Sequence, residues 1–269
     1  MCVYVASTEH RKEFVRELLS RLGIAEQVRK ARRILVKPNI VSHELYPTTT
    51  HPEVLSACLE FLIQWHKDIV VADGPAVDAG NSKTILNQHP LKRVCDNFDV
   101  PLIDLTSEEM TTIVTQSSME LELAKMVFDY DFIVSLPVLK SHGSCFFTGA
   151  LKNQFGFFSM EERVRLHLGK DIFRAIVEVN AVIKPSLFIV DAVETLTKTN
   201  ERRHGGIPAK LGYMLGGADP LSLDAFGLQL LSQLDLKLKG KRFQDIPYLA
   251  HAANLAIGDP QAQPLHLRV

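Results

Sequence analysis

The sequence predicts an α/β protein with a doubly wound, mostly parallel sheet and helices on both faces. Apolar runs of four to six residues recur along the chain and are too short for helices, so they indicate buried strands. Amphipathic helical segments alternate with these runs, which is typical of a parallel sheet covered on both faces. The composition agrees, because 46% hydrophobic and 23% charged residues in a chain of 269 are ordinary for a protein with a sizeable core.

The strands are expected where the apolar runs occur, and polar residues, proline or glycine bound many of them. In chain order the expected strands are 2–6, 33–37, 68–73, 101–105, 111–115, 131–136, 186–191 and 211–215. The helices are expected mainly where apolar residues recur at intervals of three and four among charged ones. In chain order the expected helices are 8–22, 51–65, 88–97, 160–183, 220–234 and 245–256. We expect one α/β domain over residues 1–258 and a loosely held tail over 259–269, which contains two prolines.

Charge and cysteine content exclude several classes of protein. Thirty basic and thirty-one acidic residues give a net charge of −1, so no global basic field exists to hold nucleic acid or an anionic membrane. Cys2, Cys58, Cys95 and Cys145 lie far apart without C-x-x-C spacing, which predicts free thiols in a reducing compartment and no iron–sulfur cluster. No segment reaches the roughly 18 apolar residues of a spanning helix, and the first residues do not form a signal peptide. We therefore expect a cytoplasmic protein.

Polar residues follow the predicted strands at their carboxyl ends, where ligands bind in doubly wound sheets. A threonine-rich loop at 48–50 leads into a helix, whose N-terminus would offer free N–H groups to an anion. The residues expected to bind a small anion are Lys37, Asn39, Thr50, Lys140, Ser141 and Asn153. Each of them alone is also explained as a cap or a turn. Neither the dinucleotide-binding G-x-G-x-x-G nor the P-loop pattern occurs, which argues against nucleotide binding by those routes.

Three residues around the strand 131–136 are candidates for catalysis. His142, Lys152 and His167 would supply two imidazoles and an amine, an acid–base pair around an electrophile or a ligand anchor. Two structural alternatives stay open: His167 on a solvated helix face, and Lys152 as a cap or as the ion-pair partner of Asp191. Asp191 is in turn the candidate for a metal ligand, since an aspartate at a strand end either binds a metal, orients a lysine or closes the strand.

Several motifs together resemble the uncharacterised family catalogued as domain of unknown function 362. They are Val36-Lys-Pro-Asn39, Thr49-Thr-His-Pro52, Ser135-Leu-Pro-Val-Leu-Lys-Ser-His142, Gly149-Ala-Leu-Lys-Asn-Gln-Phe-Gly156, Gly205-Gly-Ile-Pro208 and Asp219-Pro-Leu-Ser-Leu-Asp-Ala225. The resemblance runs from about residue 32 to 258 and implies an α/β fold with no established general reaction. Many members of that family carry ferredoxin-like cysteine motifs, which implies redox partners for those members; this chain lacks the motifs.

The central stretch alone also resembles the lactate racemase family. In that family a strand is followed by a histidine, then ten residues later by a lysine that carries a nickel-pincer nucleotide, then by a further histidine that ligates nickel. His142, Lys152 and His167 have this spacing, so the resemblance implies the same roles for them. The chain departs from the pattern in having Ala150-Leu151 in place of a glycine pair before the lysine. It also has no counterpart of a second proton-transferring histidine in the segment 73–78.

Two functions from different classes follow. The first is a cytoplasmic enzyme, racemase-like, isomerase-like or redox-associated, that binds a small carboxylate or phosphate at the carboxyl edge of the sheet. Lys37, Asn39 and Lys140 would hold the anion, His142 would move a proton, and Lys152 would act as electrophile or cofactor anchor. The second is a non-catalytic module that holds a metal or cofactor for a redox partner protein. The cofactor is left open between a divalent metal and a nickel-type group, and the chain is compatible with a homo-oligomer.

Overall fold

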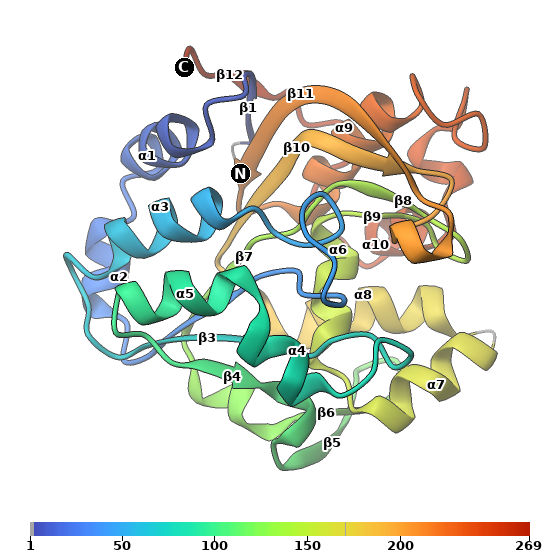
Figure 1. Ribbon diagram of the computed structural model, residues 1–269. Coiled ribbons are helices and arrows are strands. Elements are labelled where there is room, and N and C mark those ends of the chain that lie inside the picture. The colour runs from blue at the N-terminus through green and yellow to red at the C-terminus, as the bar shows by residue number, and fades with distance from the viewer. Residues whose placement is uncertain (1–2, 170) are drawn as a thin grey trace.

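The computed structural model describes residues 3–169 and 171–269, and an eight-stranded sheet forms its centre (Figure 1). The strands are β1 (Val3–Ser7), β2 (Ile34–Lys37), β3 (Ile69–Asp73), β4 (Leu102–Asp104), β7 (Phe132–Ser135), β10 (Leu187–Thr197), β11 (Ile207–Gly217) and β12 (Leu265–His266). Their order in the sheet is β12-β1-β11-β10-β7-β2-β3-β4. The five strands from β10 to β4 are parallel to one another, and β11 runs antiparallel between β10 and β1. The sheet is therefore mostly parallel, as the sequence predicts.

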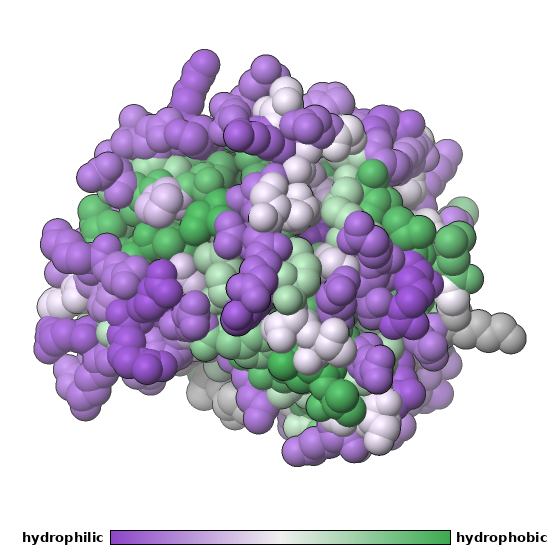
Figure 2. All heavy atoms as spheres, turned by 90° about the horizontal axis from the view of Figure 1, so that it is seen from below, coloured by the Kyte–Doolittle hydropathy of each residue, from purple (hydrophilic) through white to green (hydrophobic). Residues whose placement is uncertain are grey.

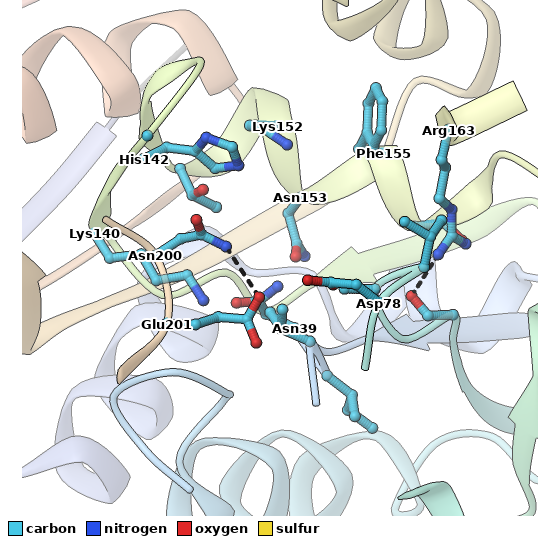
Figure 3. Close-up of a pocket in the computed structure, with 18 of the residues that line it drawn as sticks. Asn39, Asp78, Lys140, His142, Lys152, Asn153, Phe155, Arg163, Asn200 and Glu201 are labelled. Carbon is cyan, nitrogen blue, oxygen red and sulfur yellow. Dashed lines mark hydrogen bonds between the residues drawn. The ribbon is translucent and has the colours of Figure 1, made fainter. Parts of the chain in front are cut away.

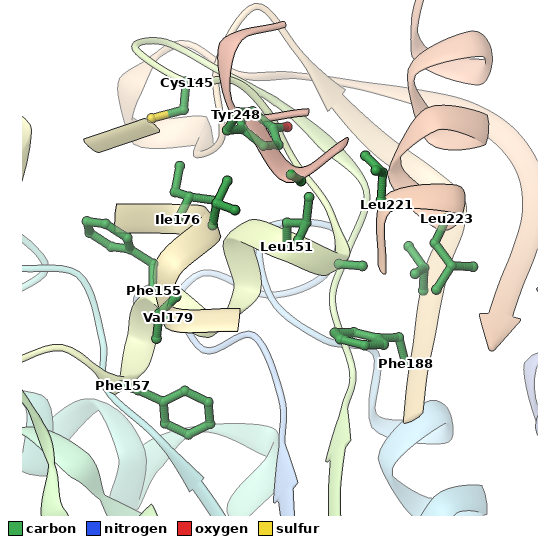
Figure 4. Close-up of a cluster of buried hydrophobic side chains, with 14 of the residues drawn as sticks. Cys145, Leu151, Phe155, Phe157, Ile176, Val179, Phe188, Leu221, Leu223 and Tyr248 are labelled. Atoms are coloured by element: carbon green, nitrogen blue, oxygen red, sulfur yellow. The ribbon is translucent and has the colours of Figure 1, made fainter. Parts of the chain in front are cut away.

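Helices cover both faces of this sheet, which confirms the doubly wound arrangement. One face packs against α1 (Arg11–Leu22), α3 (Pro52–Leu62) and α5 (Pro90–Asn97), with α2 (Ala25–Lys30) and α4 (Ser82–Gln88) beside them. The other face packs against α6 (Ala150–Asn153), α8 (Ile172–Ile183), α9 (Pro220–Leu231) and α10 (Pro247–Asn254). Successive residues of a strand point to opposite faces. Accordingly, Ile34 and Val36 of β2 belong to the core on the side of α1 and α3, and Leu35 belongs to the core on the side of α6 and α8. Figure 4 shows the second of these cores around Leu151 and Ile176.

Two hairpins and a broken helix were not predicted in this form. The hairpins are β5 (Met110–Val114) with β6 (Glu120–Ala124), and β8 (Lys140–His142) with β9 (Phe146–Thr148). The predicted helix 160–183 is divided into α7 (Met160–Leu168) and α8, because α7 ends before Gly169. The paired strands β10 and β11 have 11 residues each, about twice the predicted length, and continue past the end of β7. Their extension carries the segment 198–206 towards the carboxyl edge of the sheet.

The segment after residue 258 includes β12, which pairs in parallel with β1 through Tyr4 and Leu265. Within residues 3–169 and 171–269, no helix is long and apolar enough to cross a membrane. Cys58, Cys95 and Cys145 are free thiols in the interior, while Cys2 lies outside the described residues. Figure 2 shows a mostly hydrophilic face with separate hydrophobic patches.

Candidate functional site

A cavity of about 520 Å³ lies where β2 and β3 end, at the carboxyl edge of the sheet (Figure 3). Its wall is built from the ends of these strands, the hairpin β8–β9, α6, one side of α7 and the segment between β10 and β11. Ligands of doubly wound sheets bind at this edge. The position of the cavity therefore agrees with the place that the sequence predicts for a site.

Seven of the ten predicted site residues line the cavity. They are Lys37, Asn39, Lys140, His142, Lys152, Asn153 and His167. They come from β2 and the loop after it, from β8, from α6 and from α7, so segments distant in the sequence meet at one place. Thr50, Ser141 and Asp191 are not in the lining.

The three residues outside the lining have partners within the protein. Ser141 lies between Lys140 and His142 in β8, and successive side chains of a strand point to opposite faces, so Ser141 points away from the cavity. Its hydroxyl donates to Asp235 Oδ2 at 2.5 Å. Thr50 supports the site indirectly, since its hydroxyl accepts the N–H of Asn39 at 2.7 Å and donates to a backbone carbonyl. The carboxylate of Asp191, predicted as a metal ligand, accepts hydrogen bonds from Arg11 Nε at 2.7 Å and from the Tyr46 hydroxyl at 2.8 Å. Asp191 thus joins α1 to β10.

Lys37 is a buried cation whose charge is already paired. Its amine donates to Asp73 Oδ1 at 2.5 Å, and 1% of the lysine is exposed. Burial lowers the pKa of Lys37, and the Asp73 carboxylate opposes that shift. Gly156 leaves room for the pair, because a Cβ at that position would lie 2.7 Å from Lys37 Nζ. Lys37 therefore contributes less positive charge to the cavity than its residue type suggests.

Lys140 is the second buried lysine of the wall, and none of its hydrogen-bond partners in the described part of the chain is a carboxylate. Its amine donates to the Thr48 carbonyl, and again only 1% of the residue is exposed. Burial lowers the pKa of Lys140 to about 7. An anion that entered the cavity would stabilise the charged form of this amine.

Arg163 lines the cavity but was not predicted as a site residue. Its guanidinium donates to the carbonyls of Gly74, Pro75, Gly156 and Phe158 at 2.7 to 2.9 Å. Burial lowers its pKa to about 10. Because its N–H groups are directed to these carbonyls, Arg163 holds the loop after β3 against α7 and shapes the wall.

Lys152 differs from the other cations of the cavity. It is 8% exposed, and its amine forms no hydrogen bond or ion pair with any described residue. Nζ lies 4.5 Å from the centre of the Phe155 ring, and Figure 3 shows the side chain beside His142 at the cavity. Burial is the main cause that lowers the pKa of Lys152. The ion pair with Asp191, one structural alternative, is absent because Asp191 is bound by Arg11 and Tyr46.

The short helix α6 holds Lys152 in place. Asp224 of α9 accepts the N–H groups of Ala150 and Leu151 at the start of α6. A Cβ at Gly149 would overlap the Asp224 carboxylate, so the glycine permits this approach. The position of Lys152 therefore depends on a buried carboxylate on another helix.

The rings of His142 and His167 stack with centroids 6.5 Å apart and planes inclined by 24°. His142 Nδ1 accepts the N–H groups of Ser144 and Cys145, both at 3.2 Å, so its Nε2 carries the proton. His167 Nδ1 lies 2.7 Å from the Arg163 carbonyl and must donate to it, which leaves a lone pair on its Nε2. Burial lowers the pKa of both rings. The neutral pair offers one donor and one acceptor.

Two alternatives for His167 are reconciled by its position. The side chain belongs to an exposed stretch of α7, as expected for a solvated helix face, and it also lines the cavity. Its ring meets Phe155 edge to face, with centroids 5.2 Å apart. His167 thus lies where solvent and cavity meet.

A cluster of Asp78, Glu201 and His204 also lines the cavity and was not predicted. One ligand atom from each lies within 4.8 Å of the others, a spacing that suits a metal ion. Arg203 pairs with Glu201 and with Asp78, both at 2.6 Å. The sequence feature that could have pointed to this cluster is the pair Gly205-Gly206. Both positions require glycine, because Gly205 has a φ of +88° and a Cβ at Gly206 would lie 2.7 Å from the Glu201 carbonyl.

Two side-chain amides of the cavity retain unused acceptors. The Oδ1 atoms of Asn39 and Asn153 are buried without a hydrogen-bond partner in the described structure. The orientation of Asn153 is fixed, because its Nδ2 donates to the Lys37 carbonyl and to the Ser135 hydroxyl. Buried acceptors of this kind are costly to leave unpaired, so they favour a bound molecule or water that donates to them.

A family model described as "Domain of unknown function (DUF362)" matches residues 34–229. The chain belongs to this family. Its membership confirms the resemblance seen in the sequence motifs.

Three known proteins are similar to the chain. Thylakoid-associated protein sll1697 of Synechocystis sp. is 28% identical over 229 residues, which are 82% of this chain and 70% of the relative. The lactate racemase apoprotein from Thermoanaerobacterium thermosaccharolyticum superposes with a TM-score of 0.59 at 13% identity, over 86% of this chain. A protein from Thermotoga maritima gives a TM-score of 0.44 at 15% identity, over 90% of this chain. This chain spans 57% and 59% of those two solved chains, and the first likeness shows a shared fold.

Proposed function

We propose that this protein is an enzyme that binds a small carboxylate or phosphate in the cavity at the carboxyl edge of the sheet. Lys152 carries the proposal, since a buried amine without a partner among the residues that the structure describes is rare unless a ligand or a reaction uses it. Lys152 would act as nucleophile or attachment point, and His142 and His167 would donate and accept protons. Purely structural lysines pair their charge, as Lys37 does.

Anion binding would fall mainly to Lys140 and Asn39. Lys37 is neutralised by Asp73, and the Arg163 N–H groups are occupied by carbonyls. Lys140 and Lys152 line the same cavity, and the Lys152 charge adds to the effect of burial in lowering the pKa of Lys140. An anion between them would relieve this repulsion, and charge-assisted hydrogen bonds of this kind contribute about 1.5–3 kcal/mol each.

A cofactor bound through Lys152 also fits the residues present. The free amine offers an attachment point, and the lone pair on His167 Nε2 offers a metal ligand, as in a nickel-type cofactor. Such a group would supply an electrophilic centre. His142 would not be a ligand in its present tautomer, because its Nε2 carries a proton and would donate to the substrate instead. The reaction class favoured by this arrangement is a racemisation or isomerisation with proton transfer.

The test combines binding with analysis of protein from its native source. We expect acetate and phosphate to bind saturably by calorimetry, and Lys140→Met to weaken that binding about tenfold or more, with Lys67→Met as an exposed control. Intact mass and metal content of the native protein would reveal an attached cofactor. Saturable binding that Lys140→Met and Lys152→Met both leave unchanged would place the anion elsewhere and refute the proposal.

A second candidate function is metal binding for delivery to a redox partner protein, and the cluster at Asp78, Glu201 and His204 favours it. Two carboxylates and an imidazole are suitable ligands for a divalent transition metal. Equilibrium dialysis with Zn²⁺ and Ni²⁺ would test it, with Glu201→Gln as the altered site and the remote Glu60→Gln as control. Stoichiometric binding lost only in Glu201→Gln supports the second candidate, and equal uptake by both variants rejects it.

A further inference from the structure

The amine of Lys152 is chemically set apart from the three other cations buried in the wall of the cavity. Lys37 donates to Asp73 and to the Pro38 carbonyl, Lys140 donates to the Thr48 carbonyl, and Arg163 donates to backbone carbonyls. Lys152 forms no such bond with a described residue and lies over the Phe155 ring. Only this amine is therefore free of a protein acceptor among these four.

We propose that Lys152 forms an imine with the carbonyl carbon of a small anionic aldehyde or ketone, a 2-oxo carboxylate in the simplest case. The proposal rests on the proposed function and names its substrate class. An anchored cofactor is the alternative use of the same amine, and a protein that carries one would leave no free amine to react.

The neutral amine is the reactive form, and the surroundings of Lys152 favour it. No carboxylate of residues 3–169 or 171–269 pairs with the amine. Burial is the largest cause that lowers its pKa, and the Arg163 charge lowers it further, against an opposing contribution from Cys145. A surface lysine at neutral pH is almost entirely protonated and cannot attack a carbonyl. A larger fraction of Lys152 than of an exposed lysine is thus neutral and able to attack a carbonyl.

The two histidines supply the complementary proton positions. Both rings line the cavity together with the amine, and burial and, less strongly, the Lys152 charge lower the pKa of both. His142 Nε2–H can donate to the carbonyl oxygen and so polarise the carbon, whereas His167 Nε2 can accept a proton from the attacking nitrogen.

The step balances without any oxidant or reductant. The amine nitrogen forms a bond to the carbonyl carbon, and the carbon–oxygen double bond opens to a hydroxyl. The nitrogen then loses its second proton, the hydroxyl group is protonated and leaves, and the carbon–nitrogen double bond forms. Both protons of the neutral amine end on the departing oxygen, which leaves as water.

Lys140 gives the reason for an anionic substrate. Its side chain lines the same cavity as Lys152, and its pKa is lowered mainly by burial and also by the Lys152 charge. A carboxylate held by Lys140 would bring a directly attached carbonyl group towards Lys152. In a 2-oxo carboxylate the carboxylate and the carbonyl group are on adjacent carbons. This arrangement fits the cavity better than a long-chain substrate with the two groups far apart.

The experiment is reductive trapping with sodium cyanoborohydride at pH 7, followed by peptide mapping. Glyoxylate is the probe, acetaldehyde is a carbonyl without the anion, and acetate is an anion without the carbonyl. We expect glyoxylate to label Lys152 at least about tenfold faster than the exposed Lys67 and Lys83, which serve as internal references. Lys140→Met should slow labelling by glyoxylate and leave labelling by acetaldehyde unchanged. Lys67→Arg should label like the wild type, and Lys152→Arg should lose the rapid adduct.

The outcomes separate the imine from the anion site. If glyoxylate and acetate compete for one saturable site but Lys152 labels no faster than Lys67, the imine is refuted while the anion site stands. If neither anion binds and Lys152 is unreactive, both proposals fail. If acetaldehyde and glyoxylate label Lys152 equally fast, the amine is reactive but the anionic substrate class is wrong.

Discussion

Asp224 accepts the N–H of Ala150 at 2.6 Å, and through this bond α9 fixes the start of the helix that carries Lys152. The second N–H, from Leu151, reaches the same carboxylate at 3.0 Å. A helix of four residues has too few internal hydrogen bonds to be stable alone. The site therefore depends on a residue that does not line the cavity.

Replacing this carboxylate should impair both stability and site geometry. Asp224→Ala leaves two buried N–H groups unpaired, so we expect the free energy of unfolding to fall by about 2–6 kcal/mol, because each unpaired group costs about 1–3 kcal/mol. Urea unfolding measures the first effect, and labelling of Lys152 measures the second. Asn81→Ala removes a comparable cap from α4, where Asn81 accepts the Thr84 N–H at 2.9 Å, and should leave Lys152 unaffected. Equal labelling in both variants would contradict the positioning role.

The contribution of Asp224 should depend on pH. Burial raises its pKa from 3.8 to about 7, so the folded state retains a proton that the unfolded state releases between these values. The stabilisation is complete below pH 3.8 and is lost as the pH rises through 7. Asp224→Asn cannot ionise, so its stability deficit relative to the wild type should shrink between pH 4 and pH 8. A deficit independent of pH in urea titrations would argue against the raised pKa.

Asp191 should behave as a structural residue. Its ion pair with Arg11 is buried, with side chains 1% and 10% exposed. Removal of one partner from a buried pair costs about 3–5 kcal/mol, and we expect this loss for Asp191→Ala in chemical denaturation. Asp68→Ala is the matched surface variant, because the Arg33–Asp68 pair is exposed and should contribute about 0–1 kcal/mol. A change in metal content in the folded Asp191→Asn protein would instead support the metal role suggested by the sequence.

Anion affinity should fall in alkaline solution. Lys140 binds an anion in its charged form, and its pKa in the free protein is about 7. Acetate affinity should be nearly constant below pH 7 and should decrease up to about tenfold per pH unit above it. Calorimetry from pH 5.5 to 9 measures this, with Lys140→Met as a weak and nearly flat reference. A flat profile for the wild type would remove Lys140 from the anion site.

The fold was predictable because its strands are short apolar runs with clear ends. Errors occurred where tertiary pairing overrides the local pattern. The polar residues Asp191 and Glu194 interrupt the apolar run of β10, yet the strand continues to Thr197 because it pairs with β11 along its length. In β8, Lys140 and His142 looked like loop residues, since so short a strand has no periodic signal of its own.

The site was predictable where it follows strand ends and not where remote segments complete it. Lys37 ends β2, Asn39 follows it, and Lys152 comes after β7 and the hairpin β8–β9, so all three lie past strand ends visible in the sequence or close to them. Glu201 reaches the cavity only because β10 and β11 are long, and their length was not visible in the sequence. Arg163 looked like any charged residue of a surface helix, and its burial follows from packing of α7 on the loop after β3.

The order of strands in the sheet also determines when each strand can pair as the chain emerges from the ribosome. β2 and β3 can pair as soon as residue 73 has been made, and β7 can join them after residue 135. β1 pairs with β11 and β12, so Val3 and Val5 have no strand partner until residues beyond 207 have been synthesised. β1 therefore precedes β2, β3 and β7 in the chain but pairs later than they do. The nascent chain must keep this segment from aggregating until most of the protein exists.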